Sequence, residues 1–248
     1  MNFEDHFSEL AETYSKYRPQ YPSALFEYLA NNCKEHSLAW DCGTGNGQAA
    51  IELAKYFDKV LATDASRDQL KLAQQHSKIT YRVETAEKVS LENSSTDLIT
   101  VAVAVHWFDF EKFYSEVKRV LKPTGIIAVW AYHIFDISPE INSIIEKYYY
   151  KTLDGYWPER FQYLDKRYKT LPFPFKEIIP PKFEMTTEWN MNQVLGFLNS
   201  WSGTKNYSQK NDRHPLNEIW DDLKKAWGDE KIIRGVNWPL NIRVGKKV

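Results

Sequence analysis

Little in this 248-residue sequence points to a membrane, a metal site or a nucleic acid. Only two cysteines occur, Cys33 and Cys42, without the paired spacing of metal ligands, and this low use of cysteine indicates a reducing compartment. The acidic N-terminus lacks the apolar stretch of a signal peptide, and no run approaches the roughly 18 apolar residues that span a bilayer. The net charge of -1 would not attract a polyanion, and the short basic cluster 166–169 predicts a solvated face. We therefore expect a cytoplasmic protein with no metal, no membrane insertion and no nucleic-acid partner.

The sequence also lacks internal repeats, low-complexity segments and linkers rich in glycine and serine. A chain of this length can bury a sizeable core, and α/β sheets of this size often form one domain. Aromatic residues make up 15% of the chain, and most of the nine tryptophans fall in its second half. The alternation of strands and helices weakens beyond residue 135. We expect a single domain with an aromatic insertion in its second half.

Glycine is scarce, but three glycines stand at alternate positions after a short apolar run. Residues 38–47 read LAWDCGTGNG, and Gln48–Ala54 predicts a helix. Glycine lets the backbone turn sharply and approach a ligand closely. The free N–H groups at the start of the helix would point to the same space. This pattern predicts a nucleotide-type binding turn between a strand and a helix; a loop without a ligand is the alternative.

A second apolar strand, Val60–Asp64, ends in a carboxylate about 20 positions after Gly43. In a β-α-β unit this spacing brings an acidic side chain to the ribose of a bound nucleotide. A carboxylate suits that place because it accepts two hydrogen bonds from a diol. We predict that Asp64 binds ribose hydroxyls; a solvated aspartate at a strand end is the alternative.

The glycine spacing separates two classes of nucleotide-binding protein. The dinucleotide pattern needs a small residue at position 48, where this chain has Gln48. The glycines instead follow Asp41 in the order D-x-G-x-G-x-G, which resembles the motif of class I S-adenosylmethionine (SAM)-dependent methyltransferases. A carboxylate such as Asp41 attracts the methionine ammonium of SAM and would repel a pyrophosphate. An NAD-dependent oxidoreductase is the weaker alternative.

The resemblance extends over residues 10–135. Asp97–Phe108 resembles the fourth strand of the superfamily, and a helix at 109–121, an LKPTG turn and the strand Ile126–Trp130 follow as in that family. Tyr14–Pro22 resembles the Y-x-x-Y-R-P-x-Y-P segment of a small-molecule branch that includes trans-aconitate methyltransferase-like proteins. The chain is thus similar to methyltransferases of the type 11 class. This implies an α/β fold with a doubly wound, seven-stranded, mostly parallel sheet, an N-terminal helical segment and an inserted helical, aromatic lid.

Within this single domain, 1–248, the patterns divide the chain further. Ser138–Lys151 and Met191–Ser200 predict helices, and the prolines in Leu171–Phe175 favour an extended segment. The expected parts are N-terminal helices at 1–37, a SAM-binding core at 38–135, a lid or substrate-side insertion at 136–180 and 190–228, and a final strand within 236–248.

The resemblance also implies a set of residues around SAM. Gly43 and Gly45 would lie against the methionine, and Tyr14 and Arg18 would close over it. The segment 85–87 would face the adenine, with a threonine where the superfamily often has an aspartate. The predicted cofactor-binding set is Tyr14, Arg18, Asp41, Gly43, Thr44, Gly45, Gly47, Asp64, Ala65, Thr85, Ala86, Glu87 and Ala104.

Methyl transfer is an in-line displacement in which the enzyme mainly supplies proximity and orientation. A base is needed only when the acceptor arrives protonated. His106 follows the fourth strand at the edge where ligands bind, so it is the candidate catalytic base; lining the pocket is the alternative. His133 is a second, weaker candidate. The predicted substrate-binding residues are His106, Trp107, Trp130, His133, Trp157 and Tyr207, although the aromatic residues among them suit core packing equally.

We therefore expect a SAM-dependent methyltransferase that acts on a small molecule, with a carboxylic acid as the suggested acceptor. The Asn/Asp-Pro-Pro-Tyr tetrad of amino-methylating nucleic-acid enzymes is absent, because the sequence VAVH stands at 103–106. A SAM-binding sensor or interaction protein without catalysis is the alternative from another class. The chain is expected to act as a monomer or a homodimer.

Overall fold

The computed structural model describes residues 19–247, which divide into two compact units. The core unit comprises Tyr21–His133, Gln162–Glu184 and the chain from Pro239 onward. The second unit comprises mainly Ile134–Phe161 and Met185–Trp238. The segment 162–184, which the sequence analysis placed largely in the insertion, therefore belongs to the core unit.

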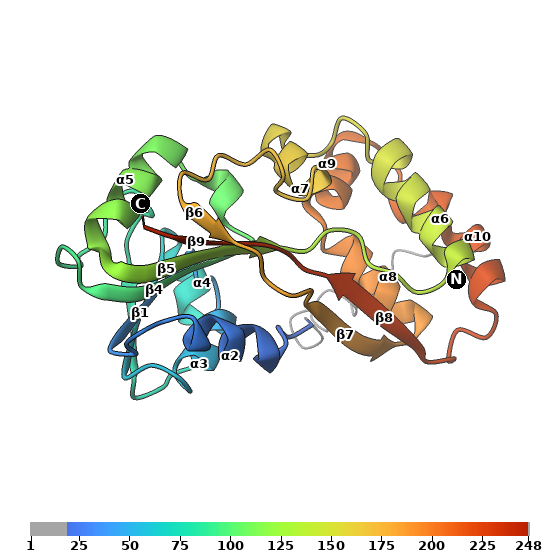
Figure 1. Ribbon diagram of the computed structural model, residues 1–248. Coiled ribbons are helices and arrows are strands. Elements are labelled where there is room, and N and C mark those ends of the chain that lie inside the picture. Colours follow the sequence, from blue (N-terminus) through green and yellow to red (C-terminus); the bar gives the residue numbers. More distant parts are fainter. Residues whose placement is uncertain (1–18, 248) are drawn as a thin grey trace. The chain divides into compact units, whose positions relative to one another are not determined.

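The core unit is built on one seven-stranded sheet (Figure 1). Its strand order is β3-β2-β1-β4-β5-β9-β6, and the first five strands in chain order are parallel, whereas β9 runs antiparallel to both neighbours. This arrangement confirms the predicted doubly wound, mostly parallel sheet. The strands are β1 (Leu38–Cys42), β2 (Lys59–Asp64), β3 (Ile79–Val83), β4 (Thr96–Ala102), β5 (Leu121–Ala131), β6 (Lys176–Ile178) and β9 (Asn241–Lys246).

The central strands are buried, as expected for parallel strands covered on both faces. Buried Asp97 on β4 ties three strands together at their amino ends. Its Oδ2 accepts hydrogen bonds from the backbone N–H groups of Ser37 and Leu38, each at 2.9 Å, and Lys122 Nζ at the start of β5 lies 2.7 Å from Oδ1. The two hydrogen bonds hold the start of β1 against β4, and the ion pair holds the start of β5 against β4, so Asp97 helps to position the loop that follows β1.

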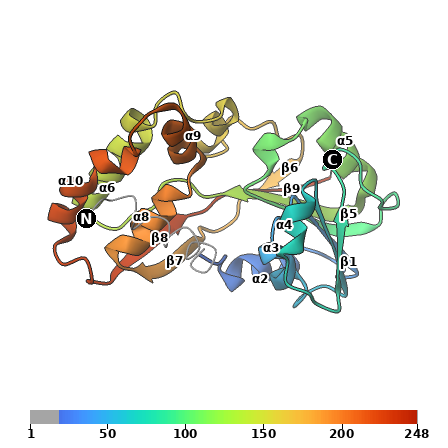
Figure 2. The same cartoon turned by 180° about the vertical axis from the view of Figure 1, so that it is seen from behind.

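Helices flank this sheet on both sides. The helix α5 (Phe110–Val120) lies on the opposite side from α2 (Ser23–Asn31) and α3 (Gln48–Leu53) (Figures 1 and 2). Asp109 caps α5 by accepting the Lys112 N–H at 3.2 Å. The helices predicted at 48–54 and 109–121 agree with α3 and α5 to about one residue. The shorter helices are α4 (Arg67–Lys71), η1 (Val105–Trp107) and α7 (Gln162–Asp165).

The second unit is mainly helical and has an aromatic core. Its rings pack at centroid separations of 5.0 Å for Trp189 and Trp238, 5.3 Å for Phe135 and Trp238, and 5.6 Å for Phe135 and Phe197. Large aromatic rings therefore supply the buried apolar surface of this small unit. Its elements are α6 (Pro139–Lys147), η2 (Tyr148–Thr152), η3 (Glu159–Phe161), α8 (Met191–Asn199), α9 (Ser202–Lys210), η4 (Pro215–Glu218), α10 (Trp220–Trp227) and a two-stranded sheet of β7 (Glu184–Trp189) and β8 (Arg234–Pro239).

Two further findings concern the described residues as a whole. No helix within residues 19–247 combines the length and the apolar character that crossing a membrane requires. Across the same part of the chain, no three or more His, Cys, Asp and Glu side chains gather in a way that could hold a metal ion.

Candidate functional site

The candidate site lies in the core unit, where the strand order reverses. β1 is flanked by β2 on one side and β4 on the other, and the connections after β1 and β4 start helices on opposite faces. In open α/β sheets, ligands bind outside the carboxyl ends of the strands at such a switch point. The predicted cofactor residues after β1, β2 and β4 therefore converge on one edge.

The loop after β1 adopts a backbone that requires glycine. Gly43, Gly45 and Gly47 have φ angles of +68°, +57° and +83°, which side chains rarely tolerate. A Cβ on Gly43 would lie 2.7 Å from Ala104 Cβ, and one on Gly47 would lie 2.5 Å from the Tyr81 hydroxyl. Among the residues that the structure describes, a Cβ on Gly45 would meet only the tip of Gln69, at 3.8 Å. The first and third glycines thus allow close packing, whereas a methyl group at the middle one would make only an ordinary contact with a described residue.

Asp41 is buried beneath this loop. Its carboxylate accepts hydrogen bonds from the Thr44 hydroxyl and, at 2.8 Å, from the Thr100 hydroxyl on the neighbouring strand. Burial raises the pKa of Asp41 to about 6, and the two threonine bonds oppose that rise. The side chain therefore orders Thr44 and places a titratable negative charge under the glycines.

Asp64 ends β2 and fastens the same loop. Its Oδ2 accepts the Gly45 N–H at 2.9 Å, and its Oδ1 accepts the Ser66 N–H at 2.8 Å. Each carboxylate oxygen can accept further hydrogen bonds, so these contacts orient the group while leaving acceptor capacity. Ala65, which follows it, is exposed.

The segment after β3 brings a further carboxylate. Ala86 is buried, Thr85 is exposed, and Glu87 accepts the Asp109 N–H at 3.0 Å, which ties this segment to the start of α5. The charges of Asp41, Glu87 and Asp64 all add to burial in raising the pKa of the Cys42 thiol well above its usual value. Three carboxylates thus surround the end of β1 and give the site a negative potential.

The chain leaves β4 through a strained residue that the sequence did not reveal. Val103 has a φ of +56°, which is an outlier for a β-branched side chain. Its N–H bonds the Trp130 carbonyl at 2.8 Å, so pairing with β5 retains the strained turn. The turn presents Ala104 to Gly43 and begins the short helix η1, where Trp107 is half exposed and His106 is buried.

His106 contacts a residue that the sequence analysis had placed on a solvated face. Its Nδ1 lies 2.9 Å from the Tyr168 hydroxyl. Lys166, Arg167 and Lys169 are exposed as predicted, but Tyr168 is fully buried, so the prediction was wrong for that residue. The reason is the backbone: φ angles of 52° at Arg167 and 58° at Tyr168 turn the tyrosine inward. No residue pattern signals two such angles in a row.

The other predicted substrate residues of the core unit have different surroundings. Trp130 is fully buried in β5 and packs edge-on against Tyr21 and Phe26, with ring centroids 5.5 and 6.0 Å away. His133 is largely covered, and its Nε2 lies 3.0 Å from Asp165 Oδ1. Burial lowers the pKa of His133, and Asp165 opposes that change. Trp130 thus packs the interior, whereas His133 pairs with a carboxylate near the end of β5.

Two predicted substrate residues belong to the second unit. Trp157 stacks on Tyr149 at 4.4 Å and donates its indole N–H to the Tyr149 carbonyl at 3.0 Å. Tyr207 packs on Tyr156 at 4.8 Å, and its hydroxyl lies 3.3 Å from a Glu218 oxygen. Both therefore take part in the packing of that unit, and a role in substrate binding stays a prediction. The predicted cofactor residues Tyr14 and Arg18 lie outside the described residues.

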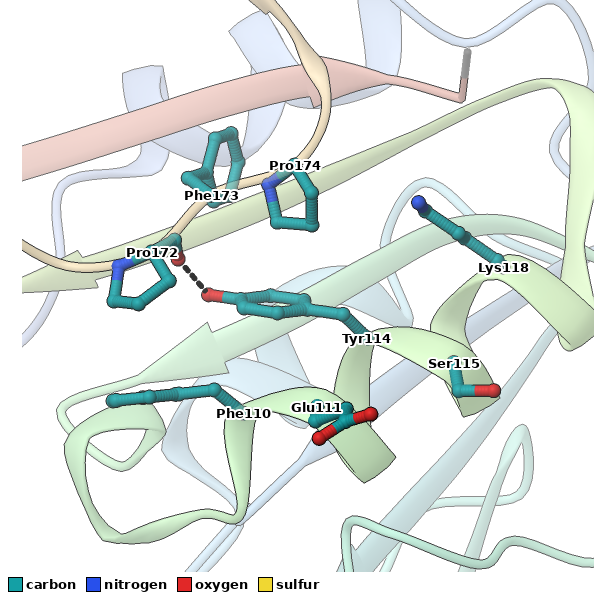
Figure 3. A pocket seen from close by; sticks show the side chains of 8 residues that line it. All are labelled: Phe110, Glu111, Tyr114, Ser115, Lys118, Pro172, Phe173 and Pro174. Atoms are coloured by element: carbon teal, nitrogen blue, oxygen red, sulfur yellow. Dashed lines mark hydrogen bonds between the residues drawn. The ribbon is translucent and has the colours of Figure 1, made fainter.

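A groove of about 650 Å³ lies elsewhere on the core unit, between one face of α5 and the proline-containing segment before β6 (Figure 3). Tyr114 forms its floor, and the Tyr114 hydroxyl donates a hydrogen bond to the Pro172 carbonyl at 2.6 Å. Of the predicted cofactor residues that lie within 19–247, none lines it. The lining residues are Phe110, Glu111, Tyr114, Ser115, Lys118, Pro172, Phe173 and Pro174.

Known proteins resemble this chain in sequence and in structure. A family described as "Methyltransferase domain" matches residues 40–129. A Dictyostelium discoideum protein with the provisional name of a methyltransferase is 35% identical, over 99% of this chain and 96% of that protein. A solved Anaeromyxobacter dehalogenans structure, provisionally named a type II methyltransferase, has a TM-score of 0.87 and 36% identity, and covers 94% of this chain and 99% of its own.

Other relatives match a smaller share of their own length. A Saccharomyces cerevisiae protein named as a probable S-adenosylmethionine-dependent methyltransferase is 30% identical over 56% of this chain and 50% of that protein. The family match covers the strands around the glycine loop and the end of β4. The Dictyostelium discoideum relative matches nearly the whole chain, so the similarity includes the second unit. The chain belongs to the class I SAM-dependent methyltransferase superfamily.

Proposed function

We propose that this protein transfers the methyl group of SAM to a small-molecule carboxylic acid. The observation that carries the donor site is the glycine loop, because among residues 19–247 a Cβ on Gly45 would meet only the tip of Gln69, while Asp64 accepts the Gly45 N–H. The carboxylates Asp41, Asp64 and Glu87 around β1 suit a donor with an ammonium and a sulfonium group, since opposite charges attract strongly where water is sparse. SAM would therefore lie over Gly45 with its ribose at Asp64.

The chemistry of methyl transfer favours a carboxylate as the acceptor. A carboxylate attacks the methyl group without losing a proton, so it needs orientation but no base. The resemblance of Tyr14–Pro22 to the trans-aconitate methyltransferase-like branch points to the same class. The near-neutral charge of the chain gives no support to a polyanionic substrate.

The donor site is tested by calorimetry with SAM. Asp64→Ala removes the ribose acceptor and one anchor of the loop, so we expect SAM binding to weaken by roughly 1–3 kcal/mol. Asp68→Ala is the matched control, because Asp68 is an exposed carboxylate on the next helix whose ion pair, within residues 19–247, is with Lys71. Equal affinities of the two variants would contradict the assignment of Asp64.

The acceptor is tested by product formation. The protein is incubated with SAM and pools of carboxylic acids, and S-adenosylhomocysteine and methyl esters are followed by mass spectrometry. We expect ester formation with a carboxylic acid pool and none with matched pools of alcohols, thiols and amines. Tight SAM binding without turnover in any pool would favour a SAM-binding sensor and contradict the proposal.

A further inference from the structure

A buried tyrosine contacts the one histidine at the end of β4. The His106 side chain is 1% exposed and Tyr168 is not exposed at all, and the Tyr168 hydroxyl lies 2.9 Å from His106 Nδ1. The contact joins η1 to the turn after α7, two segments of the core unit that are about 60 residues apart in sequence. Neither group can exchange this partner for bulk water.

The direction of this hydrogen bond follows from the available partners. A buried hydroxyl proton needs an acceptor, and among residues 19–247 His106 Nδ1 is the hydrogen-bond partner of the Tyr168 hydroxyl. The tyrosine keeps its proton, because burial, with Tyr21 and Tyr114 nearby, raises the pKa of its hydroxyl well above 10. The hydroxyl therefore donates, and Nδ1 accepts with its lone pair.

We propose that Tyr168 is a positioning residue that holds His106 in the neutral form with its proton on Nε2. A neutral imidazole carries one proton, and the nitrogen that accepts a hydrogen bond is the unprotonated one. The ring can then donate a hydrogen bond from Nε2 but cannot take a proton there. His106 is thus a donor that orients an oxygen atom and not a general base.

The turn that carries Tyr168 is held from several sides. The Tyr168 N–H bonds the Tyr163 carbonyl at 2.8 Å, which closes the turn after α7 in spite of its two positive φ angles. Arg243 on β9 donates to the Leu171 carbonyl at 2.6 Å, and Glu177 on β6 binds the same guanidinium. Left-handed backbone persists only where surrounding contacts determine it. These contacts keep the Tyr168 hydroxyl within hydrogen-bond distance of His106 Nδ1.

The tautomer of His106 also bears on the protonation state of the methyl acceptor. This consequence rests on the proposed function. With its proton on Nε2, His106 cannot take a proton from the acceptor there, which favours an acceptor oxygen that is already deprotonated. A carboxylate meets that condition near neutral pH, whereas an alcohol does not. A neutral Nε2–H group stabilises such an anionic oxygen by a charge-assisted hydrogen bond.

The test reads the imidazole nitrogens directly and needs no acceptor. Long-range ¹H–¹⁵N correlation spectra of the labelled full-length protein are recorded near neutral pH, and His106→Gln assigns the signals. We expect an unprotonated-type Nδ1 and a protonated-type Nε2. In Tyr168→Phe we expect the two signals to move toward each other as the tautomers mix. Tyr148→Phe, which loses a buried hydroxyl in contact with Thr204 of the second unit, is the matched control and is expected to leave them unchanged.

Three results would overturn the proposal: a proton on Nδ1 in the unmodified protein, protons on both nitrogens at neutral pH, or an unchanged pattern in Tyr168→Phe. If Tyr168→Phe fails to fold, as judged by circular dichroism, the spectrum of the unmodified protein still decides the tautomer. SAM calorimetry on the same samples keeps the two proposals apart. If the unmodified protein does not bind SAM, the proposed function is contradicted. The tautomer of His106 is decided by the spectra alone.

Discussion

At the scale of single residues, the charge of Asp41 has opposite effects on the stability of the ligand-free protein and on the binding of a cationic ligand. Its burial makes the ionised form costly in the folded protein and raises its pKa to about 6, although Thr44 and Thr100 donate to it. A cationic ligand would compensate that cost. The charge is therefore unfavourable for the empty site and favourable for the bound one, as is common where a site is built for a ligand.

Asp41→Asn is expected to make the ligand-free protein more stable at pH 7. Asparagine keeps the shape, its oxygen can still accept the Ala50 N–H, and the threonine hydroxyls can donate or accept, so the main change is removal of a buried charge. We expect the free energy of unfolding to rise by on the order of 1–3 kcal/mol, since a tenfold change in acidity corresponds to about 1.4 kcal/mol. Urea unfolding at pH 7 measures it, and lower stability of the variant would contradict the burial argument.

The contribution of Asp41 to folding stability is expected to change with pH in one direction. The pKa of Asp41 is higher in the folded chain, about 6, than in the unfolded chain, about 4. The folded state thus holds the proton more tightly, so this group lowers stability as pH rises from 4 to 6 and has its full effect above 6. The advantage of Asp41→Asn should vanish near pH 4. SAM affinity of the unmodified protein should fall below pH 6, and a flat affinity in calorimetry would contradict a role for the ionised carboxylate.

His106 gives a second prediction at this scale, to be measured once an acceptor is known. Glutamine can place an N–H group close to the position of imidazole Nε2, whereas asparagine reaches only as far as Nδ1. If His106 is a donor, His106→Gln should retain at least tenfold more turnover than His106→Asn, at similar SAM affinity. Equal and near-complete loss of kcat in both variants would instead indicate a base, since neither amide accepts a proton.

At the scale of elements, the glycine loop was predictable because its signals are local. Alternating glycines, a preceding aspartate and a following helix fix the backbone over ten residues, and β1 to α3 form where the sequence pattern placed them. Tyr168 and Val103 could not be predicted in this way. Their positions depend on positive φ angles that tertiary packing and backbone hydrogen bonds maintain, in residue types that usually avoid them. Three-residue β6 likewise has no pattern of its own, because its pairing with β9 defines it.

Glycines with positive φ offer matched substitutions in this loop. Alanine at any of them costs about 1–2 kcal/mol of stability from the left-handed backbone. Gly43→Ala should cost more, because its Cβ would lie 2.7 Å from Ala104. At Gly45 an added Cβ would clash with none of residues 19–247, so Gly45→Ala should show only the backbone cost yet lose SAM binding, since the added methyl group occupies the space for the donor.

Gly155→Ala is the control for this series. Gly155 has a φ of +75°, a Cβ added there would meet no heavy atom of the described residues within 4 Å, and the residue belongs to the second unit. We expect thermal unfolding to show similar losses for Gly45→Ala and Gly155→Ala, with SAM affinity unchanged only in Gly155→Ala. Normal SAM binding by Gly45→Ala would contradict the placement of the donor.

At the scale of the whole molecule, the chain passes between the two units several times. The core unit takes its first five strands from one continuous stretch but collects β6 from 162–184 and β9 from the C-terminal residues. Sequence patterns could recover the first stretch, where strands and helices alternate. They could not assign 162–184, because that segment has only short elements and its unit is set by pairing with β9.

This arrangement makes the C-terminal strand essential for a domain whose recognisable motifs all lie far upstream. β9 pairs with β5 from Ile126 to Ala131, all of which are buried, and it is also the partner of β6. Deleting residues 241–248 would leave β5 as a long, apolar edge, which is prone to pair with other chains. We expect the truncated protein to aggregate and to bind no SAM, although its glycine loop and Asp64 are intact. Removal of Val248 alone should preserve soluble, SAM-binding protein in size-exclusion chromatography and calorimetry. A soluble truncated protein with normal SAM affinity would mean that the first five strands suffice to hold the site.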